Sequence, residues 1–127
     1  MQAATRPTDA ELAILRVLWE RGPSTVRQVF EVLSEDRELG YTTALKMLQV
    51  MHEKGLVARD VTERVHVFSA AQSRSETQRN LLGDLLDKAF GGSSLNLVMQ
   101  ALATRKASRK ELAEIRKLLD EAEGRKP

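Results

Sequence analysis

Apolar side chains recur at helical spacing along most of this chain of 127 residues. The clearest stripe spans residues 41–54, where Ala44, Leu48 and Met51 fall on one face of a predicted helix. Glycine readily adopts the left-handed conformation that ends helices, so we expect this helix to stop at Gly55. The stretch therefore predicts one helix with a single buried face.

After Gly55 the pattern changes to one that is typical of strands. Residues 56–57 and 65–68 are rich in β-branched and aromatic side chains, and the polar residues 60–64 between them have turn chemistry. A helix followed directly by a two-stranded ribbon is typical of a winged helix-turn-helix. In that arrangement the helix enters a DNA groove and the ribbon tip contacts the DNA backbone. We take it as the working interpretation.

Two shorter helices are expected before this core. The first follows a capping box at residues 8–11 and ends before the pair Gly22-Pro23. The second is capped by Ser24 or Thr25 and carries an apolar stripe at helical spacing. Each break between these segments has the residue types that ends of helices require, so the predicted elements agree with one another.

The second part of the chain is rich in leucine and predicts three further helices. Capping sequences at residues 73–76, 93–94 and 108–111 mark where these helices begin. The pair Gly91-Gly92 separates the first of them from the second. The apolar surface of the three helices is larger than so short a segment buries by itself.

Two explanations of this surface stay open. The helices either pack back onto the winged domain or form a core that two chains share. Repeated leucine pairs widen the apolar stripe beyond one packing partner, which favours the homodimer. We therefore predict a mainly α fold with a small β-ribbon, in which residues 1–71 form a winged helix-turn-helix DNA-binding domain and residues 72–127 a helical dimerisation domain. The predicted dimerisation residues are Leu81, Leu82, Leu85, Leu86, Phe90, Leu95, Val98, Leu102, Leu112, Ile115, Leu118 and Leu119.

Composition excludes several functional classes. The absence of cysteine removes disulfides, thiolate catalysis and cysteine metal sites. No apolar run is long enough to cross a bilayer, and the N-terminus lacks the apolar segment of a signal peptide, so we expect a cytoplasmic protein without membrane insertion. The sequence has no Gly-rich phosphate loop, metal-ligand spacing or Ser/His/acid set. We predict that the chain is not an enzyme and needs no cofactor or metal.

Charge gives weaker support to DNA binding. The chain carries 20 Lys and Arg against 18 Asp and Glu, yet residues 1–70 contain nine basic and ten acidic side chains. Attraction to phosphates must therefore come from the placement of the charges rather than from their number. A protein-interaction module, in which the winged helix presents its third helix to another protein, is the alternative from a different class. Steep salt dependence of duplex binding would separate the two.

The order of these segments resembles that of a known family. The segments are DAELAILRVLWERGPSTVRQVFEVL, GYTTALKMLQVMHEKGLV and ERVHVFSA, followed by a leucine-rich part that ends in SRKELAEIRKLL. From about Thr8 to Glu123 they are similar to the penicillinase-repressor (BlaI/MecI) family of bacterial regulators. The resemblance implies a homodimeric transcriptional repressor that binds a palindromic operator in double-stranded DNA through a winged helix.

The resemblance also implies how repression ends. In penicillinase repressors a cut at an Asn-Phe bond in the C-terminal half relieves repression, which makes a membrane-bound sensor metalloprotease a further candidate partner. The matching position here is Gln100-Ala101, which lacks the large aromatic side chain. Copper-responsive relatives carry C-terminal cysteines, and this chain has none. We expect a signal that disrupts the dimer, and any proteolysis should use another bond or a protease with a different pocket.

Four of the side chains predicted to contact DNA lie on the third helix. Tyr41, Thr42 and Thr43 occupy its first turn, where short side chains and free backbone N–H groups can meet phosphates or base edges. The alternative is that the threonines only cap the helix. Lys46 lies one turn further along the same side. Its sequence context fits a contact with a phosphate or guanine as well as it fits a solvated lysine.

The other four predicted contacts lie outside that helix. Arg59 and Arg64 flank the ribbon tip, where an arginine can contact the sugar-phosphate backbone, and Arg64 matches the wing arginine of the family. Thr25 and Arg27, at the start of the second helix, could hold the DNA backbone from the other side. We interpret His66 as an ordinary strand histidine, because one other histidine is too few for a metal site.

Overall fold

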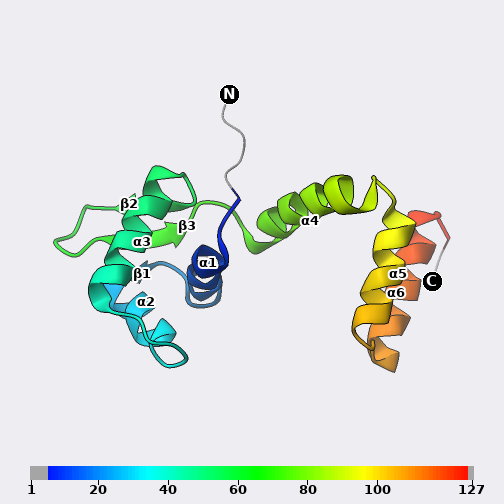
Figure 1. Ribbon diagram of the computed structural model, residues 1–127, viewed down its shortest axis with the longest axis horizontal. Helices are drawn as coiled ribbons and strands as arrows, with labels where there is room; N and C mark the ends of the chain where they lie inside the picture. Colours follow the sequence, from blue (N-terminus) through cyan, green and yellow to red (C-terminus); the bar gives the residue numbers. More distant parts are fainter. Residues whose placement is uncertain (1–5, 126–127) are drawn as a thin grey trace. The chain divides into compact units, whose positions relative to one another are not determined.

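The computed structural model describes residues 6–125 of the chain. It divides into two compact units, one up to Leu82 and one from Gly83. Helices dominate and the strands are short, which confirms the predicted mainly α fold with a small β element (Figure 1). Within the described residues the elements are α1 (Asp9–Arg21), β1 (Ser24–Thr25), α2 (Val26–Leu33), α3 (Tyr41–Glu53), β2 (Val57–Asp60), β3 (Val67–Ala70), α4 (Arg74–Phe90), α5 (Ser94–Thr104) and α6 (Arg109–Ala122).

Side-chain caps set the starts of α1 and α2. Before α1, the Thr8 hydroxyl accepts from the Glu11 N–H (3.1 Å) and the Glu11 carboxylate accepts from the Thr8 N–H (2.9 Å). Thr25 and Gln28 form the same reciprocal pair before α2. Both boxes satisfy N–H groups that a helix start leaves without partners. Of the two caps that the sequence allowed for α2, Thr25 is the one used.

Gly55 ends α3 as the pattern predicts. Its φ of +82° is the left-handed conformation that side chains with a Cβ rarely adopt. The next residue, Leu56, turns back so that its N–H donates to the Met51 carbonyl at 2.9 Å. This reversal brings β2 back along α3 and so places the wing beside that helix.

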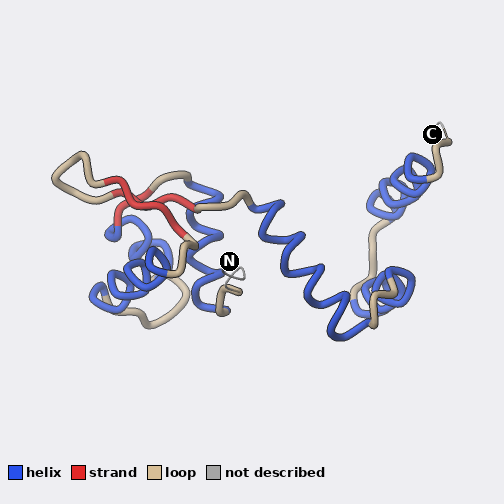
Figure 2. Tube along the Cα trace, turned by 90° about the horizontal axis from the view of Figure 1, so that it is seen from above, coloured by secondary structure: helices blue, strands red, loops and turns tan. Residues whose placement is uncertain are grey.

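The strands form an antiparallel sheet in the order β1-β3-β2 (Figure 2). The sequence pattern did not predict β1, because a strand of two residues is too short to show a period. This strand pairs with β3, and Ser24 lies opposite Phe68. It also placed the strands of the ribbon one to two residues too early. Val65 and His66 lie in the loop rather than in β3, because the pairing of β3 with β2 ends at the partners Asp60 and Val67. The Asp60 carboxylate accepts hydrogen bonds from the N–H and the hydroxyl of Thr62. The turn therefore begins only after Asp60.

The core of the first unit joins α1, α2 and α3 to the sheet. Its largest fully buried side chains include Ile14, Leu48, Met51 and Phe68. The predicted stripe of α3 is confirmed, since Ala44, Leu48 and Met51 are all buried. The sequence of α1 predicts that Leu12, Leu15, Leu18 and Trp19 are buried. The buried face is broader: it includes Ala13, Ile14, Leu15, Val17 and Leu18, with Leu12 and Trp19 partly buried at its edge.

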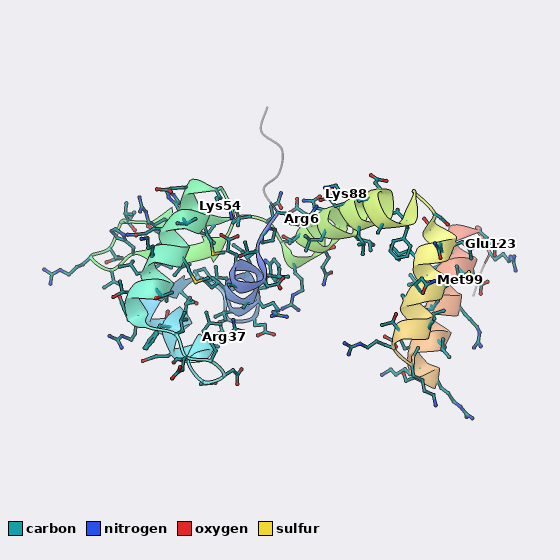
Figure 3. The ribbon with its side chains drawn as sticks, viewed as in Figure 1. Arg6, Arg37, Lys54, Lys88, Met99 and Glu123 are labelled. Carbon is teal, nitrogen blue, oxygen red and sulfur yellow. The ribbon has the colours of Figure 1, made fainter. Side chains whose placement is uncertain are left out.

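An ion pair ties the first turn of α1 to the end of α3. Lys54, labelled in Figure 3, places its Nζ 2.8 Å from both carboxylate oxygens of the buried Glu11. Burial raises the pKa of Glu11, but the hydrogen bonds from Lys54 and Thr8 outweigh it and hold this pKa below its ordinary value. The pair therefore stabilises the fold above the ordinary carboxyl pKa and is lost as the pH falls through the lowered one.

The helices of the C-terminal part begin at the predicted caps, and α4 ends at Phe90, directly before the pair Gly91-Gly92. Ser73 and Glu76 form a capping box before α4, and Ser93 and Ser108 cap α5 and α6. Neither α5 nor α6 has a buried residue in the single chain. Within residues 6–125, no helix combines the length and apolar character that are required to cross a membrane.

Candidate nucleic-acid interface

The core fixes which side of α3 faces outward. Because Ala44, Leu48 and Met51 hold one face of the helix in the core, the opposite face is exposed. That face carries three of the predicted contacts, together with two residues that the sequence reasoning did not select. Its exposed residues include Thr42, Thr43, Lys46, Gln49 and Val50.

The first turn of α3 has no side-chain cap. Gly40 is the N-cap, and among the described residues no side chain accepts a hydrogen bond from the first-turn amides as a cap. The threonines therefore do not cap the helix, which was the alternative to a contact role. Free N–H groups at a helix start and hydroxyls beside them are groups that hydrogen-bond phosphate oxygens.

Five of the eight predicted contacts line one hollow between α3 and the wing. This hollow, called the wing-side hollow below, has a volume of about 330 Å³. The residues from the prediction are Thr25, Arg27, Tyr41, Arg59 and Arg64. Gln49 and His66 line it as well. Two helices and the ribbon thus bring three arginines to one concave surface. In this way residues 1–70, which carry no net positive charge, can still attract a phosphate backbone.

The other three predicted contacts lie on the opposite flank of α3. Thr42, Thr43 and Lys46 line a hollow of about 380 Å³ toward the start of α1, called the α1-side hollow below. Met47 and Val50 complete its lining on α3. The candidate residues therefore form two groups with α3 between them, rather than one cluster.

Two aromatic rings hold the Arg27 side chain. Its guanidinium carbon lies 5.0 Å from the centre of the Tyr41 ring and 5.8 Å from that of Phe30. The two rings meet edge to face, with centroids 5.8 Å apart and planes at 65°. Cation–π and edge-to-face contacts of this kind restrict the side chains that make them. Phe30, which belongs to the predicted apolar stripe of the second helix, thus also positions Arg27 and Tyr41.

In the described winged part, two acidic side chains are already bound within the protein, whereas three basic ones are not. The Glu11 carboxylate is neutralised by Lys54, and Asp60 is bound by Thr62, whose backbone N–H lowers the pKa of Asp60. Lys46, Arg59 and Arg64 make no hydrogen bond or ion pair with any described residue. Their charges are therefore available to a ligand.

The Thr25 side chain already makes one hydrogen bond within the protein. Its hydroxyl oxygen accepts from the Gln28 N–H as the cap of α2. A hydroxyl that accepts keeps its own O–H to donate, so the cap does not exclude a contact with a phosphate oxygen.

Gln49 could have been found from the sequence, because it lies three residues after Lys46 on the same helix.

Three helices, a small antiparallel sheet and an exposed third helix beside a wing define a winged helix-turn-helix protein. The model of the penicillinase repressor family matches residues 7–121, and the chain belongs to that family. Its relatives include the transcriptional regulator BlaI of Mycobacterium tuberculosis, 39% identical over 95 residues that cover 74% of this chain and 69% of the relative.

A second relative aligns over almost the whole chain. It is the penicillinase repressor of Bacillus licheniformis, 24% identical over 126 residues that cover 99% of this chain and 98% of the relative. The penicillinase repressor of Staphylococcus aureus is 18% identical over 112 residues, which cover 88% of this chain and 89% of that one. The family is that of the penicillinase repressors, and its relatives here are a transcriptional regulator and two penicillinase repressors, which confirms that the chain is not an enzyme.

Proposed function

We propose that the protein is a homodimeric repressor whose two winged-helix units bind the two halves of a palindromic operator. In each half-site α3 enters the major groove and the wing contacts the neighbouring backbone. The observation that carries this proposal is the wing-side hollow, where Arg27, Arg59 and Arg64 converge beside α3. Arginines placed along the edge of a groove-reading helix are suited to phosphates on either side of that groove.

The apolar surface of the C-terminal helices supports the homodimer. Seven of the twelve predicted dimerisation residues are exposed in the single chain, and the others are half-buried. Met99, labelled on α5 in Figure 3, is exposed as well. Exposed apolar side chains in this number favour an interaction site, and a second copy of the chain offers the same residues in return. The exposed members are Leu82, Leu85, Leu95, Val98, Leu102, Leu118 and Leu119.

Replacing Arg64 by alanine should weaken binding to all duplexes by a similar factor. An arginine in the wing loop contacts the sugar-phosphate backbone, and the loss of one phosphate contact per protomer lowers the slope of log K against log salt by about one per half-site. Fluorescence anisotropy over a salt series measures both effects. Arg16→Ala, which removes an exposed arginine from outside both hollows, serves as the control.

A different result would contradict this role of Arg64. If Arg64→Ala left nonspecific affinity intact but changed the preferred sequence, the side chain would read bases rather than the backbone. Binding of the unaltered protein to duplex DNA without a steep salt slope would contradict DNA binding itself. That outcome would favour the protein-interaction module, whose partner displaces no condensed counterions.

Repression would end through a signal that separates the dimer, because each winged unit alone binds its half-site weakly. A sensor metalloprotease that cuts the chain is one such signal. The Gln100-Ala101 bond lies inside α5, and the Thr104 hydroxyl donates to the Gln100 carbonyl at 2.6 Å. A protease must unfold this turn of the helix before it can reach the bond. A protease pocket shaped for a large aromatic side chain would also contact only the methyl group of Ala101.

We therefore expect a penicillinase-type sensor protease to leave the Gln100-Ala101 bond intact. The test coexpresses the protease with the full chain, adds a cell-wall antibiotic and maps fragments by mass spectrometry. A variant that carries Gln100→Asn and Ala101→Phe is the matched control, and we expect it to be cut. A fragment of the unaltered chain ending at Gln100 would contradict the prediction.

A further inference from the structure

Val50 is an apolar residue on the otherwise polar outer side of α3. It lies away from the stripe that packs into the core, and its side chain is 39% exposed. Thr42, Lys46 and Val50 follow one another at intervals of four residues, so they form a line of about 12 Å along the helix. In the proposed complex this line faces the base pairs of the major groove.

The surroundings of Val50 are those of an apolar contact. Val50 and Met47 line the α1-side hollow, whose lining is mainly apolar. Glu11 also borders this hollow, but its carboxylate is bound by Lys54 and by the Thr8 N–H. Among the described residues that line this hollow, Lys46 is therefore the charged side chain that is free to meet a ligand, and Val50 lies one helical turn beyond it.

The major groove offers one apolar group to such a surface. Guanine, cytosine and adenine present hydrogen-bonding edges there, whereas thymine also presents its 5-methyl group. We propose that Val50 determines part of the sequence specificity by packing its isopropyl group against a thymine methyl in each half-site. The inference rests on the DNA binding proposed above and adds the base that this residue reads.

The test uses duplexes that the full-length protein itself selects from a random library. Each thymine of the selected sequence is replaced in turn by deoxyuridine, which removes only the 5-methyl group. At one symmetric thymine in each half-site, the unaltered protein should lose affinity about fourfold per methyl group, and roughly fifteenfold when both half-sites are changed. Val50→Ala should bind the thymine and uracil duplexes with nearly equal affinity.

A second readout and a matched variant distinguish base reading from a general effect on folding. The salt slope of Val50→Ala should equal that of the unaltered protein, because no phosphate contact is lost. Val61→Ala removes the same atoms from a valine that is 53% exposed in the wing loop and lines neither hollow. This control should keep the full discrimination between thymine and uracil.

Three results would overturn the inference in distinguishable ways. If Val50→Ala still discriminates thymine from uracil, another residue makes the methyl contact. If the unaltered protein binds its selected duplex but tolerates uracil at every position, the operator is bound without thymine readout while the proposed function stands. If selection enriches no sequence and no duplex is bound, the proposed function fails together with the inference.

Discussion

Replacing Leu85 and Leu118 together by glutamate is expected to convert the protein into a monomer of 14.2 kDa and to abolish tight operator binding. The side chains are 49% and 63% exposed in the single chain, so the charges should not disturb the fold of one protomer. In a shared core they would be buried without partners, which costs far more than the lost leucine contacts. Because linked units gain from each other's binding, affinity for a duplex with both half-sites should fall by roughly 100-fold or more.

Sedimentation at micromolar concentration and anisotropy on the same samples measure the two effects. Ala113→Glu adds a charge to an exposed position of α6 outside the predicted set, and it should leave both the dimer and the affinity unchanged. A duplex that carries a single half-site should be bound equally weakly by the variant and by the unaltered protein. If the double variant stayed dimeric, these leucines would not form the shared core.

The ends of helices were the part of the fold that the sequence predicted best. Each helix end depends on residues within one turn, such as Thr8 with Glu11 or the left-handed Gly55. Its position therefore depends little on contacts with distant parts of the chain. The strands were placed less well, because their limits depend on partners far along the chain. The pairing of Phe68 with both Ser24 and Arg59 decides which residues belong to β3, and none of these pairings is visible in a period of two.

The candidate site was predictable as a set of residues but not as an arrangement. Helical phase alone selects Thr42, Thr43 and Lys46 as exposed. The division into two hollows and the rings around Arg27 arise where α2, α3 and the wing meet. A single sequence records which side chains are present on each element, whereas the packing of one element on another decides which of them converge.

Phe68→Ala is expected to unfold the winged-helix unit well before the C-terminal helices. Phe68 is 1% exposed in the central strand, and its ring also borders the wing-side hollow. Truncating a buried phenylalanine costs about 3–5 kcal/mol, because it removes the apolar contacts and leaves a cavity. For a unit of this size that loss should lower its melting temperature by roughly 15–30 °C.

The same variant tests whether the two units unfold separately. Calorimetry of the full chain should show one transition that moves to lower temperature and a second that stays in place. Between the two, DNA binding should be lost while sedimentation still finds a dimer, because the proposed dimer surface lies mainly beyond Leu82. Val61→Ala, at an exposed position of the wing loop, should move neither transition. A single transition that shifts as a whole would instead mean that the winged unit and the C-terminal helices unfold as one cooperative body.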